Sequence, residues 1–373
     1  MSSNAASEAP SSAVQAPTTI LRAFHPGWYG AVMGTAIVGV GAYLNPGSSS
    51  NLLTAAHDIG VAFVIAAWVI AFMLVGPYLS RLVAHRDQAL ADLRNPAIGP
   101  LYATFPAALL VLAVATATAG PTIFTSSTPI TDIVTVLAIA GGLLTVAFSV
   151  VFTYILFTSE RVDTQLANGA WFIPPVANIV IPLALIPLLS HVGPTPARLL
   201  MLAGYAGFGA GLLLFLMLSI VVFARLVFHP LPQSALAPTL WIGLGPIGVG
   251  SIALLHLAAA GVHLWGPAAP AVQLLSLIAA SALWGLGVWW LFTAAALLIR
   301  YLLRGGLPFG VGLWGFTFPL GAYTVATLAI ATAWHTQPLA WGAAGLLIVL
   351  AGFWLVVAGC TLQAMVTGKA WQR

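Results

Sequence analysis

Long apolar runs alternate with short polar connections from about Arg22 to the end of the chain. A helix needs roughly 20 mostly apolar residues to cross a bilayer, and ten stretches reach that length. They begin near Pro26, Asp58, Pro100, Ile133, Trp171, Ala197, Pro238, Ala271, Phe309 and Ala340. Because lipid offers the backbone no hydrogen-bond partners, these runs predict an all-α integral membrane protein of ten transmembrane helices.

The overall composition supports a lipid-facing surface. Hydrophobic residues make up 61% of the 373 residues and charged residues only 5%, whereas soluble domains carry roughly a quarter charged residues. So few charges could not cover a surface that faces water. Residues 1–21, rich in Ser, Ala and Pro, are typical of a disordered tail. We therefore expect a cytoplasmic tail followed by one transmembrane domain, residues 22–373.

The basic residues indicate how the helices are oriented. Those on the side of both chain ends are Arg22, Arg81, Arg86, Arg94, Arg161, Arg225, Arg300, Arg304, Lys369 and Arg373. The opposite loops hold only Arg198. Because Lys and Arg are enriched in cytoplasmic loops, this split predicts that both termini lie in the cytoplasm of a multi-pass cell-membrane protein.

Several function classes find no support in the sequence. The net charge of +4 is spread singly between apolar runs, whereas a nucleic-acid footprint clusters its basic residues. Cys360 is the single cysteine and therefore indicates neither a disulfide framework nor a Cys-rich metal site. Phosphate-binding loops, His-Glu-x-x-His motifs and nucleophile elbows are missing. We expect no enzyme activity and no cofactor.

A proline recurs in four of the odd-numbered spans, in "LYATFPAALL", "AWFIPPVANI", "IGLGPIGVGS" and "WGFTFPLGAY". These prolines are Pro106, Pro175, Pro246 and Pro319, at intervals of 69, 71 and 73 residues. Each interval corresponds to one helical hairpin. Proline kinks a helix by removing a backbone hydrogen bond, so the repeat predicts five hairpins around a pseudo-fivefold axis. The kinked odd helices would form an inner ring and the apolar even helices would face lipid.

The stretches "FHPGWYGAVMGTAIV", "WFIPPVANIVIP" and "GLWGFTFPLGAYTVATL" resemble the tellurite-resistance and C4-dicarboxylate transporter family. That family includes yeast malate permeases, fungal sulfite pumps and slow-type anion channels of plants. The resemblance implies five kinked inner helices around a central anion pore, and it allows a homotrimer because the family contains trimers. In the channel members a phenylalanine of the ninth helix occludes the pore, and the matching residue here is Phe318, with Thr317 in place of a serine.

The resemblance therefore implies a membrane transporter of small anions, with C4-dicarboxylates such as malate first and sulfite or other inorganic anions as an alternative. Two further alternatives stay open: a proton-coupled carrier, and a non-conducting receptor on the same scaffold. For Phe318, ordinary helix packing is the alternative to a gate. The neighbouring Phe316 is assigned to packing.

Polar residues of the odd spans could select anions without a fixed cation, since helix dipole ends and hydroxyl or amide donors supply a gentler field. The candidate donors are Thr35, Thr104, Asn178, Ser251 and Thr317. For Asn178 an interhelical hydrogen bond is an equally good interpretation. Seven of the eight histidines fall at span ends and only His256 lies within one. His256 is therefore the candidate for proton coupling, with a structural role as the alternative.

Overall fold

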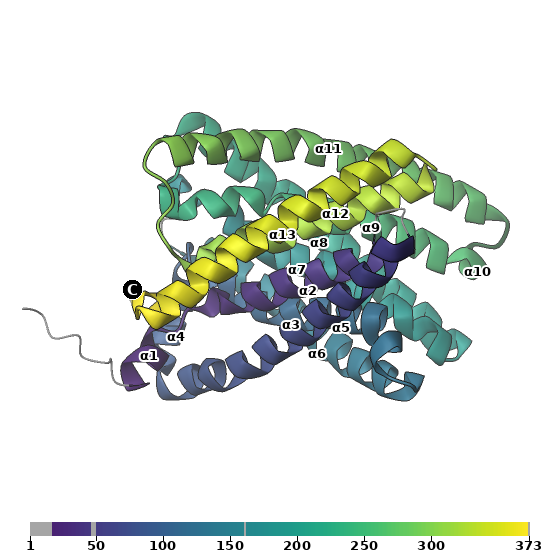
Figure 1. Ribbon diagram of the computed structural model, residues 1–373, viewed down its shortest axis with the longest axis horizontal. Helices are drawn as coiled ribbons and strands as arrows, with labels where there is room; N and C mark the ends of the chain where they lie inside the picture. The colour runs from purple at the N-terminus through teal and green to yellow at the C-terminus, as the bar shows by residue number, and fades with distance from the viewer. Residues whose placement is uncertain (1–16, 46–49, 160–161, 372–373) are drawn as a thin grey trace, which may run out of the picture.

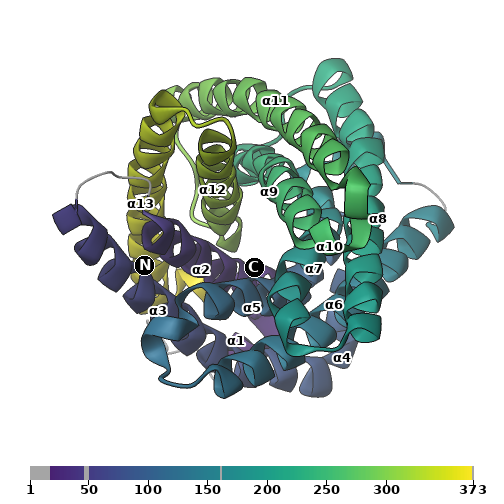
Figure 2. The ribbon, with the colours of Figure 1, turned by 90° about the vertical axis from the view of Figure 1, so that its right-hand side faces the viewer.

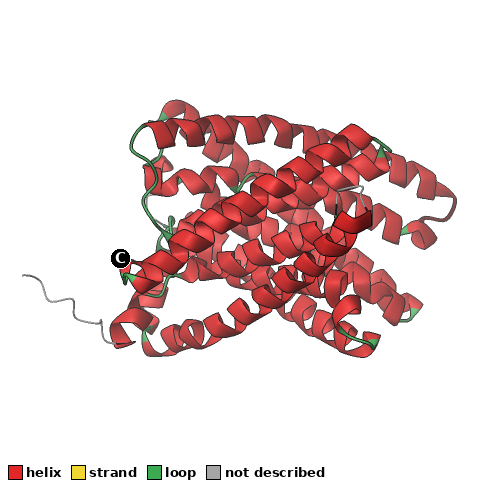
Figure 3. Ribbon diagram, in the orientation of Figure 1, coloured by secondary structure: helices red, strands yellow, loops and turns green. Residues whose placement is uncertain are grey.

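The computed structural model describes residues 17–45, 50–159 and 162–371, and within these ranges the regular structure is helical (Figures 1 and 3). Ten helical stretches in this part are long and apolar enough to cross a membrane, which confirms the expected number of spans. Their main helices are α2 (Tyr29–Leu44), α3 (Ser50–Ala84), α5 (Thr104–Ile123), α6 (Ser127–Thr158), α7 (Ile173–Leu185), α8 (Pro194–Phe228), α9 (Leu244–Ala260), α11 (Ala269–Leu303), α12 (Thr317–Ala333) and α13 (Gln337–Val366). Three shorter helices are α1 (Pro17–Ala23), α4 (Arg86–Arg94) and α10 (Val262–Trp265).

The expected tail and two of the charged positions fall partly outside this range. Residues 1–16, Arg161 and Arg373 lie outside the described part, and the last residues assigned to the tail form the start of α1. We call the end of the bundle that carries Arg81, Arg225, Arg300 and Lys369 the arginine-rich end; α1, α4 and the described C-terminal residues lie there (Figure 1).

The five odd spans form an inner layer and the five even spans an outer one (Figure 2). In the most apolar stretch of each odd span 67–83% of the residues are buried, against 11–33% in each even span. Helix α2 packs against α5, α5 against α7, α7 against α9, α9 against α12 and α12 again against α2, so these contacts close a ring. The large apolar side chains of the outer helices, such as Phe72, Phe157 and Phe292, are exposed where a membrane would surround them. The conducting pore implied by the resemblance stays a prediction at this point.

The prolines of the repeat stand at the start of the inner α-helices and not in their middle. A 3₁₀ segment precedes each one: Gly99–Ala103 before α5, Gly169–Phe172 before α7, Ser234–Trp241 before α9 and Val311–Phe316 before α12. Pro106, Pro175, Pro246 and Pro319 then each fall at the third position of the α-helix. The first N–H groups of a helix have no partner inside it, so proline is tolerated there at little cost. The prolines therefore mark the 3₁₀-to-α junction of each of these four spans.

Each outer helix packs against the inner helix of its own hairpin and also against the inner helix of the next hairpin. A tryptophan indole N–H donates to a threonine hydroxyl at three of these seams: Trp68 to Thr116, Trp284 to Thr327 and Trp354 to Thr35, each at 3.0 Å. At the seam between α6 and α7, the Asn178 amide donates to the Ser149 hydroxyl. Such bonds satisfy polar groups that lipid cannot, and they fix neighbouring hairpins against each other.

Helices α9 and α12 approach each other closely at Gly248. A Cβ atom at this position would lie 2.6 Å from the carbonyl carbon of Ala322 and from the amide nitrogen of Tyr323. Only glycine permits this backbone contact. Ala322 lies one helical turn after Phe318, so this contact helps to set the position of the Phe318 backbone.

Candidate functional site

A first cavity lies inside the ring at the arginine-rich end, with an empty volume of about 620 Å³. All five inner spans contribute to its wall, and no outer helix does. Its lining includes residues from the first turn of each inner α-helix: Gly30, Thr104, Ile173, Val176, Gly245, Phe318 and Pro319. The wall carries no Lys, Arg, Asp or Glu, and its one titratable side chain is His25.

A second cavity, of about 970 Å³, lies inside the ring toward the opposite end. Its lining again comes from all five inner spans and contains no Lys, Arg, Asp or Glu. The polar groups in this wall are Thr118, on α5, and His256, on α9. Both cavities are therefore apolar hollows on the inside of one helical ring, without a fixed charge.

Phe318 is the only residue that lines both cavities. The side chain is 5% exposed, and its Cε1 atom lies 3.9 Å from the place where a Cβ atom of Gly245 would stand. Side-chain atoms of Pro319 and Val176 are the other neighbours that such a Cβ atom would meet. The ring of Phe318 thus lies between two hollows, beside a glycine that leaves space next to it.

The direction of the inner helices gives the first cavity its electrostatic character. All five start at the arginine-rich end, so their N-termini converge around this cavity. A helix N-terminus carries a partial positive charge of roughly half an elementary charge. Five of them favour an anion over a cation without any ionised side chain.

The whole chain is similar to known membrane transport proteins. The family model described as voltage-dependent anion channel, SLAC1, matches residues 23–362. The chain belongs to the SLAC1 family. An uncharacterized transporter of Methanocaldococcus jannaschii is 30% identical over 361 residues, covering 96% of this chain and 99% of the relative. The sulfite efflux pump SSU1 of Trichophyton rubrum is 28% identical over 323 residues, 82% of this chain and 80% of that protein. The SSU1 pump of Arthroderma otae is 26% identical over 363 residues, 92% of this chain and 91% of that protein.

Membership of the SLAC1 family, together with ten apolar helices, makes this a multi-pass membrane protein of anion transport. The family and its relatives are channels, transporters and efflux pumps, not enzymes. In the described residues no group of three or more His, Cys, Asp or Glu side chains could hold a metal ion.

The structure brings only some of the expected site residues to the cavities. Phe318, Pro319 and Thr104 line the first cavity, and Phe318 and His256 line the second. The Thr104 hydroxyl donates to backbone carbonyls, to Leu101 at 2.7 Å and to Pro26 at 3.1 Å. This leaves its oxygen free only as an acceptor toward the cavity.

The other candidate donors lie within the packing and line neither cavity. The Thr35 hydroxyl donates to Ala31 at 2.7 Å and accepts from Trp354. Ser251 donates to Ile247 at 2.9 Å and Thr317 to Trp314 at 2.8 Å. Asn178 donates to Ser149 and to the Pro174 carbonyl, at 2.9 Å for the latter. For Asn178 these contacts favour the interhelical interpretation.

Three of the four prolines of the repeat also lie away from the cavities. Pro106, Pro175 and Pro246 are buried beside the ring without lining either cavity.

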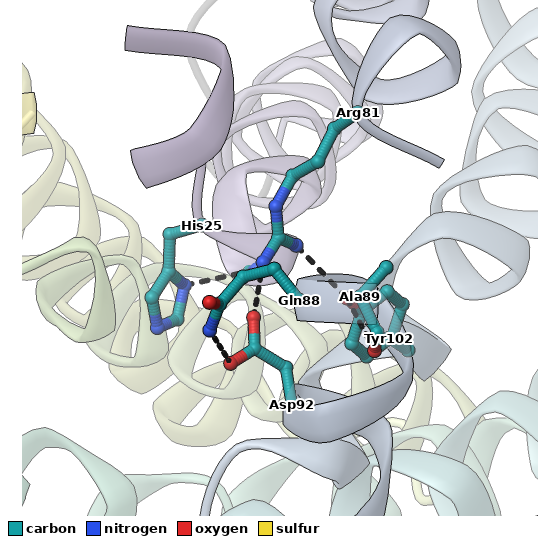
Figure 4. A network of polar contacts seen from close by, with 7 residues as sticks. His25, Arg81, Gln88, Ala89, Asp92 and Tyr102 are labelled. Carbon is teal, nitrogen blue, oxygen red and sulfur yellow. Dashed lines mark hydrogen bonds and ion pairs between the residues drawn. The ribbon is translucent and has the colours of Figure 1, made fainter. Parts of the chain in front are cut away.

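A buried polar network at the arginine-rich end was not among the features predicted from the sequence (Figure 4). Arg81, at the end of α3 and only 2% exposed, pairs with Asp92 of α4 and donates to the Tyr102 hydroxyl at 2.8 Å. Tyr102 in turn donates to the Ala89 carbonyl at 3.2 Å. Arg81 was expected only as a topology marker, whereas it fixes α4 onto the start of the α5 span. His25 stands nearby, and its Nδ1 accepts from the Gly27 amide at 3.1 Å.

Proposed function

We propose that the protein conducts small anions through the middle of the helical ring and that the Phe318 ring closes this conduit. One observation carries the proposal: Phe318 is the single residue common to the two axial cavities. An apolar constriction between two hollows blocks ions because it excludes the water that would accompany them. The fold explains why the ring stands there, since Phe318 precedes Pro319 at the junction where α12 begins.

The uncharged walls support a pathway of weak binding. A full charge in the wall would hold an anion tightly and slow its release. Converging helix N-termini attract anions into the first cavity with partial charges only. We place the arginine-rich end in the cytoplasm, because Lys and Arg favour that side. A homotrimer remains an expectation from the resemblance.

For the substrate we put sulfite first and C4-dicarboxylates such as malate second. This reverses the expectation from the sequence, because the SSU1 relatives that match most of this chain act on sulfite. Both are small oxyanions that suit a conduit selecting by charge sign and size. We propose an ion gradient or the membrane potential as the driving force.

The test compares the two phenylalanines of the "GFTFP" stretch. Phe318→Ala should raise the basal flux of nitrate, sulfite and malate into liposomes by at least about tenfold, since roughly 1.4 kcal/mol of barrier corresponds to tenfold in rate. Phe316→Ala is the matched control: Phe316 stacks on Phe353 at 5.3 Å between ring centroids and lines neither cavity. It should lower stability without opening the conduit.

Equal flux from the wild type and from a well-folded Phe318→Ala protein would contradict the gate. Absence of anion flux from every variant, under any gradient, would contradict transport itself and favour the receptor interpretation.

A further inference from the structure

The second cavity does not end at the inner ring. A side pocket with an empty volume of about 1120 Å³ lies next to it, between α9, α11 and α12. The two hollows share four lining residues: Leu44, Ile252, His256 and Val325. His256 therefore stands where the side pocket meets the proposed anion path.

His256 is the only titratable side chain in the walls of the second cavity and the side pocket. The side chain is exposed to this space, and no hydrogen bond to it is found among the described residues. Histidine changes its charge near physiological pH, unlike the other polar groups of these walls.

The surroundings of His256 offer no acidic partner. Helix α9 packs against α7, α8, α10, α11, α12 and the 3₁₀ segment Ile186–His191, and none of these elements carries an Asp or Glu. Their titratable or charged side chains are His191, Arg198, Tyr205, Arg225, His263, Arg300, Tyr301 and Tyr323. None of these side chains lines the second cavity or the side pocket. These elements therefore offer a protonated His256 no acidic counter-charge, and an anion in the cavity could take that place.

Two further polar side chains of the pocket suit an oxyanion. Gln273 of α11 is exposed in the pocket wall and brings two amide N–H donors. The Thr332 hydroxyl donates to the Leu328 carbonyl at 2.9 Å, so its oxygen can still accept a hydrogen bond. The three side chains line one pocket: His256 and Gln273 bring N–H donors for charged oxygens, and Thr332 brings an oxygen that can accept a remaining acidic proton.

We infer that His256 and Gln273 form an anion-binding site at the junction of the second cavity and the side pocket, which fills when the imidazole is protonated. Its ligands are small oxyanions, including weak acids that keep one proton. The site rests on the proposed function in one respect: it collects anions on the side of Phe318 opposite to the arginine-rich end. Acid pH then raises the anion concentration next to the gate.

The experiment uses nitrate, whose charge does not change between pH 5.5 and 8, so any pH effect belongs to the protein. Binding is measured first, as the thermal stabilisation of the full-length protein in detergent by nitrate, compared with gluconate at equal ionic strength. A ligand that binds the folded state raises its stability in proportion to the logarithm of its concentration over Kd. The variants are His256→Gln and Gln273→Leu. The matched control is His263→Gln, which removes a histidine of α10 that lines neither hollow.

We expect nitrate to stabilise the wild type and His263→Gln at pH 5.5 and much less at pH 8. This difference should be lost in His256→Gln, and Gln273→Leu should weaken nitrate binding at pH 5.5. In liposomes at equal pH on both sides, nitrate flux through Phe318→Ala should rise on the order of tenfold from pH 8 to pH 5.5, as field focusing allows. Adding His256→Gln should abolish this rise, whereas adding His256→Lys should keep the flux high at both pH values.

A nitrate effect of the same size in His256→Gln as in the wild type would overturn the site, whatever the flux. Nitrate stabilisation that depends on His256, in a protein without anion flux, would support the site and overturn the proposed function. The experiment therefore distinguishes failure of the anion-binding site from failure of the proposed function.

Discussion

Replacing Gly248 by alanine tests whether the close contact between α9 and α12 holds the proposed gate, Phe318, in place. The new Cβ atom would stand 2.6 Å from backbone atoms of Ala322 and Tyr323. Carbon atoms in ordinary contact are about 3.5–4.0 Å apart. The two helices must therefore separate by about 0.9 Å, because neither neighbour is a flexible side chain that could turn away.

The magnitude follows from two opposing effects. Overpacking of this kind costs about 1–3 kcal/mol, and replacing glycine by alanine inside a helix returns roughly 0.5–1 kcal/mol. The net result is a loss of up to about 2.5 kcal/mol. Since Ala322 lies one turn after Phe318, the same displacement should loosen the packing of the Phe318 side chain and raise the basal anion flux.

The assay combines thermal unfolding in detergent with anion flux in liposomes. Gly285→Ala serves as the control, because a Cβ atom at Gly285 of α11 meets nothing within 4 Å. Gly285→Ala should leave both the flux and the fold unchanged, with equal or slightly higher stability. If Gly248→Ala unfolds at the same temperature as Gly285→Ala and conducts no more than the wild type, the contact does not constrain α12 and the reasoning is wrong.

Two further predictions concern the polar contacts around the ring. Asp92→Asn should lower the free energy of unfolding by about 3–5 kcal/mol because it leaves the buried Arg81 without its counter-charge. The double variant Asp92→Asn/Arg81→Met should unfold at a higher temperature than Asp92→Asn alone. A lower unfolding temperature for the double variant would refute the pairing. Trp354→Phe removes the donor to Thr35 and should cost about 0.5–1.5 kcal/mol; in a double-mutant cycle with Thr35→Val, strictly additive losses would show that this bond contributes nothing.

The sequence predicted the number of spans and their division into two layers because both depend on patterns that extend over many residues. Ten apolar runs are visible without any knowledge of packing, and prolines at regular intervals mark the inner helices. The place of these prolines within the helices was harder to predict. Pro106 and its equivalents lie in the first turn of an α-helix, and nothing in the sequence marked the 3₁₀ segments before them.

The direction in which single polar side chains point could not be predicted. An inner helix is apolar on all sides. The sequence around Thr35 and Asn178 therefore does not indicate whether these side chains point to the axis of the helical ring or to a neighbouring outer helix. In the structure both side chains form hydrogen bonds with residues of neighbouring outer helices. A signal for the seams did exist, since Trp68, Trp284 and Trp354 all lie on even spans, yet their partners are far away in the chain. Nothing in the sequence indicated that Gly245 lies beside the Phe318 side chain, because the two residues belong to different helices.

The bond between Trp354 and Thr35 joins positions 319 residues apart and links the last hairpin to the first. A ribosome delivers α2 early and α13 last, so the first helix stays without two of its final neighbours, α12 and α13, until synthesis is complete. An unfinished chain is an open arc, with buried glycines and hydroxyls of α2 facing acyl chains. Sealing against leakage therefore comes as the last step of biogenesis, and a shortened protein lacking its C-terminal hairpin should be recognised by membrane quality control.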